Sequence, residues 1–195
     1  DGSNIRALSA NVEHDNTPWP LPDGRILYTR WEYIDRSQVD YHHLWTMNPD
    51  GTAQMVYYGN LHPGQLMIGA KPVPDSRMVV ATFSPGHGQR DHIGRIMLVD
   101  PRRGPDHPGS AREITREMTF RDPWAFSERS FMAARGRSIV LLDDQGQTLN
   151  LFTVRPEEAE AGLECFEPRP LITRRREHVI PDRTDPRQAY GRAML

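Results

Sequence analysis

The stretch "LPDGRILYTR" (residues 21–30) decides the fold, because a near copy, "VPDSRMVVAT" (residues 73–82), follows 52 residues later. The longer segment "DPWAFSERSFMAA" (residues 122–134) repeats the pattern a third time. The pattern is a short strand, a turn containing Pro, Asp or Gly, and then an apolar strand. The acidic turn residues are spaced by 52 and then 53 positions: Asp23, Asp75 and Glu128. A period of this length is a signature of repeat architectures.

Each repeat has a second half, in which a short apolar strand enters a turn rich in Asp, Asn or Gly. The three copies are "LWTMNPDGT" (residues 44–52), "IMLVDPRRG" (residues 96–104) and "IVLLDDQGQ" (residues 139–147). Such turns are favoured because Gly accepts positive φ and Asx side chains bond to their own backbone. A further strand follows each turn, so every period holds four short strands. This is the composition of a β-propeller blade, which spans roughly 40–45 residues in WD40 proteins.

We therefore predict an all-β fold, a partial β-propeller of four-stranded antiparallel blades, about three of them complete. Residues 1–155 are expected to hold the end of one blade and then blades near 12–58, 65–115 and 118–154. The chain is expected to be a fragment, since so few blades cannot close a ring. The alternative is a β-sandwich, which also has turns at intervals of roughly 8–12 residues. A sandwich does not predict that the same turn returns at a fixed period.

Residues 156–195 are predicted to form a linker and the start of a following segment. "RPEEAEAGLE" (residues 155–164) favours one or two helical turns because of its Ala and Glu content. From residue 167 to 188 the chain is rich in Pro and Arg, which excludes a regular helix and indicates an extended linker leaving the propeller. The run Arg174, Arg175 and Arg176 is interpreted as a solvated part of it.

The amino-acid composition excludes or disfavours several classes of partner and cofactor. A formal net charge of −2 favours neither nucleic acid nor an anionic membrane. No apolar run approaches the roughly 18 residues of a membrane span. Cys165 is the only cysteine, so this segment holds no CxxC zinc site and no CxxCH haem attachment, and no cofactor is expected in it. Lys71 is the only lysine among 24 basic residues.

The long loops and most histidines are expected on one face of the propeller. In a blade, the loop before the first strand and the loop between the second and third strands emerge on the same side. These segments cover residues 11–16, 31–43, 59–64 and 84–95. We call the candidate binding residues on them the loop face: His14, Asp15, Asp40, His42, His43, His62, His87, Asp91 and His92.

Three interpretations of the loop face stay open. Surface loops are polar in any case, and His with Asp is ordinary loop chemistry. His and carboxylate groups also suit divalent cations, and neighbouring loops would bring His42 or His43 close to His62. The third interpretation is nucleophilic catalysis by Ser84 with a nearby His and Asp91, although no strand-to-helix turn fixes that geometry. No catalytic residue is assigned, because the segment contains no complete catalytic motif.

The stretch "DNTPWPLPDGRILYTRWEYIDRSQVDYHHLWTMNPDGT" (residues 15–52) resembles the TolB/PD40 class of WD40-like propellers. The particular residues of this stretch, including "YTRWEYIDRS" and "HHLWT", are most similar to the propeller middle domain of hydrazine synthase alpha subunits. The resemblance implies a periplasmic or otherwise exported multidomain protein, with c-type haem elsewhere in the polypeptide. The implied partners are the other domains of that polypeptide or a separate protein.

Two functions follow as expectations. The first is a non-catalytic propeller module that acts as a scaffold or binding domain. The second is a propeller that lines the active site of a haem oxidoreductase related to hydrazine synthase. The absence of a complete catalytic motif favours the first, and CxxCH motifs elsewhere in the gene would favour the second. The aromatic residues Trp19 and Trp124 occupy equivalent repeat positions and are expected to pack between blades.

Overall fold

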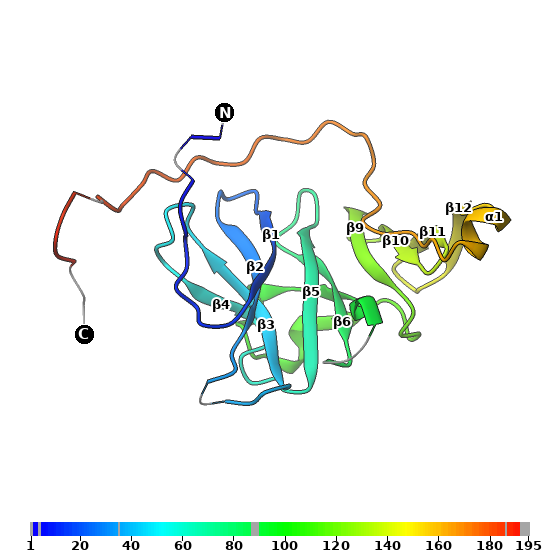
Figure 1. The fold of residues 1–195 in the computed structure, drawn as a ribbon, viewed down its shortest axis with the longest axis horizontal. Coiled ribbons are helices and arrows are strands. Elements are labelled where there is room, and N and C mark those ends of the chain that lie inside the picture. The colour runs from blue at the N-terminus through cyan, green and yellow to red at the C-terminus, as the bar shows by residue number, and fades with distance from the viewer. Residues whose placement is uncertain (1, 4, 35, 87–89, 186, 192–195) are drawn as a thin grey trace.

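The computed structural model describes residues 2–3, 5–34, 36–86, 90–185 and 187–191. The described chain is all-β, with its strands arranged in two sheets (Figure 1). Its helical parts are one short α-helix and three 3₁₀ turns: α1 (Pro156–Glu160), η1 (Arg90–His92), η2 (Pro101–Arg103) and η3 (Pro108–Ser110). The all-β prediction is therefore confirmed.

The first four strands form an antiparallel meander, here called unit 1. They are β1 (Asp15–Pro20), β2 (Ile26–Trp31), β3 (Tyr41–Met47) and β4 (Met55–Tyr58). Each strand pairs with the next along the chain. Consecutive antiparallel strands need only short connections, which the Pro, Asp and Gly turns supply.

Unit 2 repeats this arrangement with β5 (Gln65–Pro72), β6 (Val79–Ser84), β7 (Arg95–Val99) and β8 (Ala111–Glu113). All three pairings inside it are antiparallel. A two-residue parallel contact between β3 and β5 joins units 1 and 2 into one eight-stranded sheet. The prediction of antiparallel pairing is thus right within each unit, and at the junction the first strand of unit 2 lies parallel to the third strand of unit 1.

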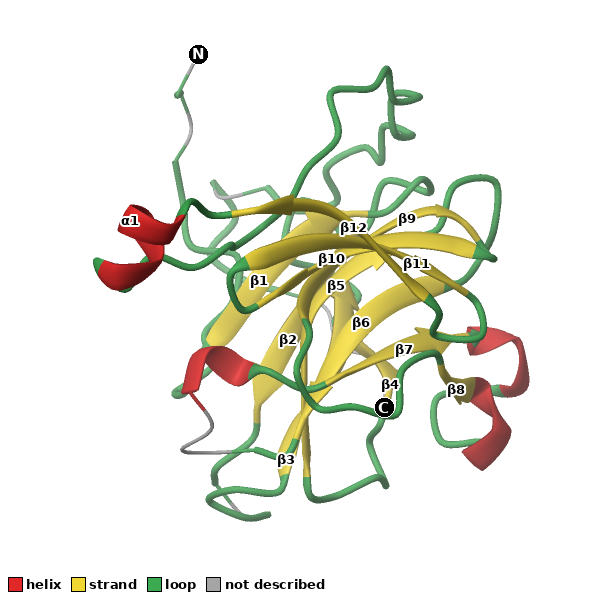
Figure 2. Cartoon of the chain, turned by 90° about the vertical axis from the view of Figure 1, so that its right-hand side faces the viewer, coloured by secondary structure: helices red, strands yellow, loops and turns green. Residues whose placement is uncertain are grey.

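Unit 3 is the separate four-stranded sheet formed by β9 (Arg121–Ser127), β10 (Ser130–Arg135), β11 (Ser138–Asp143) and β12 (Thr148–Thr153). Its strand order is again that of a simple antiparallel meander. Figure 2 shows this sheet lying over the strands of unit 2. The predicted acidic residues all lie in the turn between the first and second strands of their units: Asp23, Asp75 and Glu128.

The repeat also appears in the backbone angles of the first strands. Thr17, Gly69 and Asp122 have φ values of 47°, 65° and 52°, and they follow the spacing of the turns. In each case the pairing with the second strand shifts register at this residue. A bulge of this kind bends a strand and redirects the side chains that follow it. The three units therefore share a local distortion as well as a strand order.

Two hydrophobic cores hold the units together, and β6 contributes to both. All six residues of β6 are buried. Val79 and Ala81 belong to the core shared by units 1 and 2, while Val80 belongs to the core shared by units 2 and 3. Successive side chains of a strand point to opposite faces, so a strand covered on both sides has to be apolar throughout.

The C-terminal segment, residues 163–191, is extended as predicted, with no helix or strand in its described part. The expectation that it leaves the sheets is wrong, because it runs back across them (Figure 1). The Cys165 amide donates to the Gly136 carbonyl of unit 3 at 2.8 Å, and the His178 amide donates to Pro22 of unit 1 at 3.1 Å. Proline and arginine exclude a helix here, but they do not prevent an extended chain from bonding to exposed turns.

Candidate functional site

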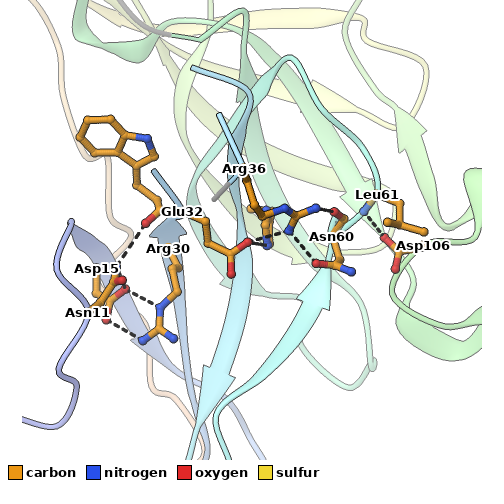
Figure 3. A network of polar contacts seen from close by, with 10 residues as sticks. Asn11, Asp15, Arg30, Glu32, Arg36, Asn60, Leu61 and Asp106 are labelled. Atoms are coloured by element: carbon orange, nitrogen blue, oxygen red, sulfur yellow. Dashed lines mark hydrogen bonds and ion pairs between the residues drawn. The ribbon is translucent and has the colours of Figure 1, made fainter. Parts of the chain in front are cut away.

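At the start of the loop face, the polar residues are engaged in structural contacts. The Asp15 carboxylate accepts two bonds from the Arg30 guanidinium, at 2.9 and 3.0 Å, and a third from Asn11 at 3.3 Å (Figure 3). The exposed His14 ring meets Trp31 edge-on, with ring centroids 5.8 Å apart. A bidentate pair of this kind orients both side chains and uses the carboxylate's lone pairs.

His42 and His43 are adjacent on β3 and therefore project to opposite faces of the sheet. The His42 ring stacks on Trp31 at 5.1 Å, and the His43 ring stacks on Trp45 at 6.0 Å. His43 is 1% exposed, and its Nε2 lies 3.4 Å from the Glu32 carboxylate. Burial lowers the pKa of His43 to about 4 although Glu32 acts in the opposite direction, so the ring is neutral at pH 7.

The loop that follows β2 is tied to the start of unit 2 by Arg36. Its guanidinium bonds to Glu32 at 2.6 Å and to the Asn60 side chain at 2.8 Å, and it lies 3.7 Å from the centroid of the Tyr41 ring (Figure 3). Asp40 accepts a 2.7 Å bond from the Ser37 hydroxyl. Arg36 is thus paired with Glu32, and Asp40 has a hydroxyl donor from the same loop.

His62 has an aromatic partner of its own, and its predicted meeting with His42 or His43 stays a prediction. His62 stacks on Tyr58 at 5.1 Å, and its Nε2 lies 3.1 Å from the Asp106 carbonyl oxygen. Asp106 also accepts a 2.6 Å bond from the Leu61 amide (Figure 3). Among the described residues, no group of three or more His, Cys, Asp or Glu side chains is placed to hold a metal ion.

The remaining loop-face residues belong to the loop between β6 and β7. Asp91 pairs with Arg90 at 3.0 Å and with Arg121 at 3.3 Å, and the neighbouring His92 is exposed. His87 lies outside the described residues, so the interpretation that pairs it with Ser84 stays a prediction. Asp91 is thus committed to two arginines, one of which belongs to unit 3.

A second group of residues lies where the first strands of the three units meet, and we call it the inner cluster: Trp19, Lys71 and Trp124. Each stands four positions before the acidic turn residue of its own unit. The Trp19 and Trp124 rings meet edge-on at 5.7 Å, and the Lys71 ammonium lies 5.5 Å from the centroid of the Trp19 ring. The prediction that these tryptophans pack between repeats is confirmed, since they come from units 1 and 3 and meet each other.

Lys71 is a buried cation with a partner from the C-terminal segment. The residue is 4% exposed, and its Nζ lies 3.4 Å from the Glu167 carboxylate and 3.3 Å from the Gly69 carbonyl oxygen. Burial lowers the pKa of Lys71. The negative charges of Glu167 and Asp122 act to raise it, but they do not cancel the effect of burial. Burial likewise raises the pKa of Asp122.

Glu167 is held from several sides. Its carboxylate accepts bonds from Arg169 at 3.1 and 3.3 Å, and its amide donates to the Asp122 carboxylate at 3.1 Å. Burial acts to raise the pKa of Glu167, but attraction to Lys71 and the Arg169 bonds outweigh it, so the pKa lies below its usual value. Glu167 adopts a φ of 42°, a left-handed backbone that is unfavourable for a residue with a Cβ.

Arg121 anchors the C-terminal segment next to the inner cluster. Its side chain is 3% exposed and donates twice to the Cys165 carbonyl, at 3.2 and 3.0 Å. It also pairs with Glu164 at 2.7 Å and lies 3.6 Å from the centroid of the Phe166 ring. Because a buried guanidinium needs charged or carbonyl partners, these contacts fix where residues 164–166 lie.

The sequence contained a signal for the inner cluster that the search for histidines and carboxylates did not use. Lys71 is the only lysine, and it occupies the repeat position at which the other two units carry Trp19 and Trp124. A charged residue at an inward repeat position, where the other repeats have tryptophan, indicates a buried charge that needs a specific partner. The contacts of Lys71 with Glu167 and of Trp19 with Arg169 had no such signal, because they join segments about a hundred residues or more apart.

Comparison of this chain with protein-family models, with curated proteins and with solved structures finds no match. In the part of the chain that the structure describes, no helix has the length and apolar character needed to cross a bilayer. The arrangement of the described residues therefore carries the functional argument.

Proposed function

We propose that this chain is part of a WD40-like β-propeller that serves as a non-catalytic scaffold or binding module in a larger, exported multidomain protein. One observation carries the proposal: three units share strand order, turn chemistry and a bulge, and they bring equivalent inner positions to one cluster. Blades arranged around an axis share these features. Export to the periplasm is proposed from the resemblance of residues 15–52.

The exposed side of unit 3 supports a role within a larger assembly. β12 is exposed along its whole length, and Leu149 and Leu151 are 64% and 50% accessible. The last strand of unit 1 differs, since Tyr57 and Tyr58 at the end of β4 are buried in the core shared with unit 2. An edge strand with exposed apolar side chains is a liability unless another element covers it. The proposed partners are therefore other domains of the same polypeptide.

The loop face supports the non-catalytic part of the proposal. Asp15, Asp40 and Asp91 are each bonded to neighbouring side chains, and His43 is buried and neutral. A general base or nucleophile would need to be accessible and within reach of a reacting atom. Binding through such a face needs only shape and polarity, which these loops provide.

The test is an experimental structure of the full natural polypeptide, together with its haem absorbance spectrum. The proposal expects further four-stranded units that complete a ring and cover β12, with no haem against the loop face. An open arrangement that leaves β12 in solvent would refute the propeller. Haem seated against these loops would instead support the oxidoreductase alternative.

Expression of residues 1–155 alone gives a simpler check. The uncovered strand β12 and its apolar side chains should make this piece aggregate or fold only partly. Sedimentation velocity and thermal unfolding measure both properties. A monomer that melts cooperatively would show that the three units suffice for a stable domain.

A further inference from the structure

The inner cluster has the features of a binding site for a negatively charged group. Lys71 is the only lysine, is buried, and lies at the junction of three units rather than at the surface. A buried ammonium requires a counter-charge, because burial without one is costly. The single carboxylate within 4 Å of its Nζ among the described residues is that of Glu167.

Trp124 supplies a second, independent indication. The residue is 8% exposed, and its indole Nε1 is a buried donor with no hydrogen-bond partner among the described residues. Buried donors in folded proteins are nearly always satisfied, so this donor, on a ring that meets Trp19, can take an acceptor that Glu167 does not supply. The Trp19 ring contacts both Trp124 and the Lys71 ammonium, so the two indole rings form one side of the cluster.

Glu167, which faces Lys71 in the inner cluster, belongs to a segment that is bound to the sheets on both sides of it. Arg121 and Gly136 hold Cys165 on one side, and Pro22 holds His178 on the other. Between them, the Glu167 side chain stays 40% exposed, so solvent reaches the carboxylate that faces Lys71. A ligand in solution would therefore reach the same position if the Glu167 side chain were absent.

We propose that the inner cluster is a carboxylate-binding site, and that Glu167 of the chain's own C-terminal segment fills it. The site takes a single carboxylate group, from Glu167 or from a free carboxylic acid. Lys71 supplies the charge, Trp19 and Trp124 supply the wall, and the segment supplies the ligand in cis. This site is separate from the loop face and does not depend on a binding role for that face.

The charges around the site favour a carboxylate over a phosphate. The Asp122 carboxylate accepts a bond from the Glu167 amide and so lies beside the bound group. Two cations contact the bound carboxylate, Lys71 and Arg169, so with Asp122 beside them the surroundings carry one net positive charge. A monoanion matches this net charge, and a dianion does not.

The experiment is chemical rescue of Glu167→Ala in the full polypeptide. Without the carboxylate, the melting temperature should fall by about 3–8 °C. Sodium acetate should restore at least half of that loss in a saturable way, while sodium chloride at the same ionic strength should not. The parent protein and the matched variant Glu160→Ala, on α1, should show no acetate-specific shift.

The double variant Lys71→Met/Glu167→Ala decides whether the rescue comes from this site. The proposal requires that acetate has no effect on it. Equal shifts with acetate and chloride in Glu167→Ala, or rescue that survives in the double variant, would overturn the proposal.

Glu167→Gln provides a second readout if Glu167→Ala does not fold. This change keeps the side-chain size and removes the charge, so the C-terminal segment should open more often. Trypsin should then cleave after Arg174, Arg175 or Arg176 about threefold faster than in the parent. An unchanged cleavage rate would show that the carboxylate does not hold the segment, and the proposal would fail.

Discussion

The loop face and the inner cluster differ in how their charged groups are used. On the loop face, each described carboxylate has a donor close by in the chain: Asp15 has Arg30 of the paired strand, Asp40 has Ser37 and Asp91 has Arg90. Lys71 of the inner cluster and Arg121 next to it are buried, and they bond to residues more than forty positions away, Glu167 and Cys165. Local pairing stabilises loops, whereas distant pairing at a junction ties whole units together.

This difference shows why density of ionisable residues is a poor guide to a site in a repeat protein. Loops collect His and Asp because water solvates them and because their conformations suit Asx turns. A buried charge is rarer, since it is retained only where specific partners offset its desolvation. The inner cluster, with one lysine and two tryptophans, is therefore the more informative region.

Arg121→Met should have the largest effect on stability. The change removes both donors to the Cys165 carbonyl and leaves Glu164 without its buried partner, so the free energy of unfolding should fall by about 3–5 kcal/mol. Urea denaturation measures this loss. Arg129→Met is the control, because Arg129 is 83% exposed and its pair with Asp144 should contribute about 0–1 kcal/mol. Equal losses in both variants would remove the distinction between buried and surface pairs.

His43 should make the protein sensitive to mild acid. Burial lowers its pKa to about 4, so below the unfolded value of 6.5 the unfolded chain takes up a proton that the folded chain does not. Stability should therefore fall by about 3 kcal/mol as the pH drops from 6.5 to 4. His43→Phe should flatten this part of the pH profile of urea unfolding, and the exposed His92→Gln should not. An unchanged profile in His43→Phe would show that His43 is not buried in its neutral form.

Asp50 should control stability at lower pH. Its carboxylate accepts bonds from Thr52 and from the Arg183 amide of the C-terminal segment, and these outweigh burial and lower its pKa to about 2. Stability present above pH 3.8 should be lost as the pH falls towards 2, by about 2 kcal/mol. Asp50→Asn should remove that acid-dependent loss. If the parent and the variant have the same slope between pH 4 and 2, the bonds from Thr52 and Arg183 do not lower the pKa of Asp50 in solution.

Arg36→Met should have the smallest effect of the four. Its side chain is 25% exposed and pairs with Glu32 in a loop, so the loss should be about 1 kcal/mol. The measurement is the same urea titration used for Arg121→Met, which makes the two regions directly comparable. A loss as large as that of Arg121→Met would mean that the loop face is as important for folding as the inner cluster.

Much of the fold could be predicted from the repeat alone. The turns at Asp23, Asp75 and Glu128 lie where the spacing places them, and the strand count per unit follows from the alternation of apolar runs and turns. Local signals suffice here, because turn residues act through their own backbone preferences. The parallel contact between β3 and β5 had no such signal, since it depends on how units 1 and 2 pack side by side.

The candidate site was harder to predict from the sequence, because it too depends on how separate segments pack together. The stacking of His42 on Trp31 and of His62 on Tyr58 depends on loop packing, which residue type and spacing do not specify. The path of the C-terminal segment was predicted as extended but not as bound. Its bonds to Gly136, Pro22 and Asp50 depend on carbonyl and carboxylate groups that are exposed only after the units have folded.

The amino-acid sequence by itself determined the period, the turns, the strand pattern and the positions that face inward, because these follow from backbone preferences and burial within one unit. Only the tertiary structure decided which inward positions meet and what faces Lys71. Trp19 and Trp124 are 105 residues apart, and Glu167 is 96 residues from Lys71. Contacts at such separations depend on the packing of whole sheets, and that packing places one buried cation opposite one carboxylate.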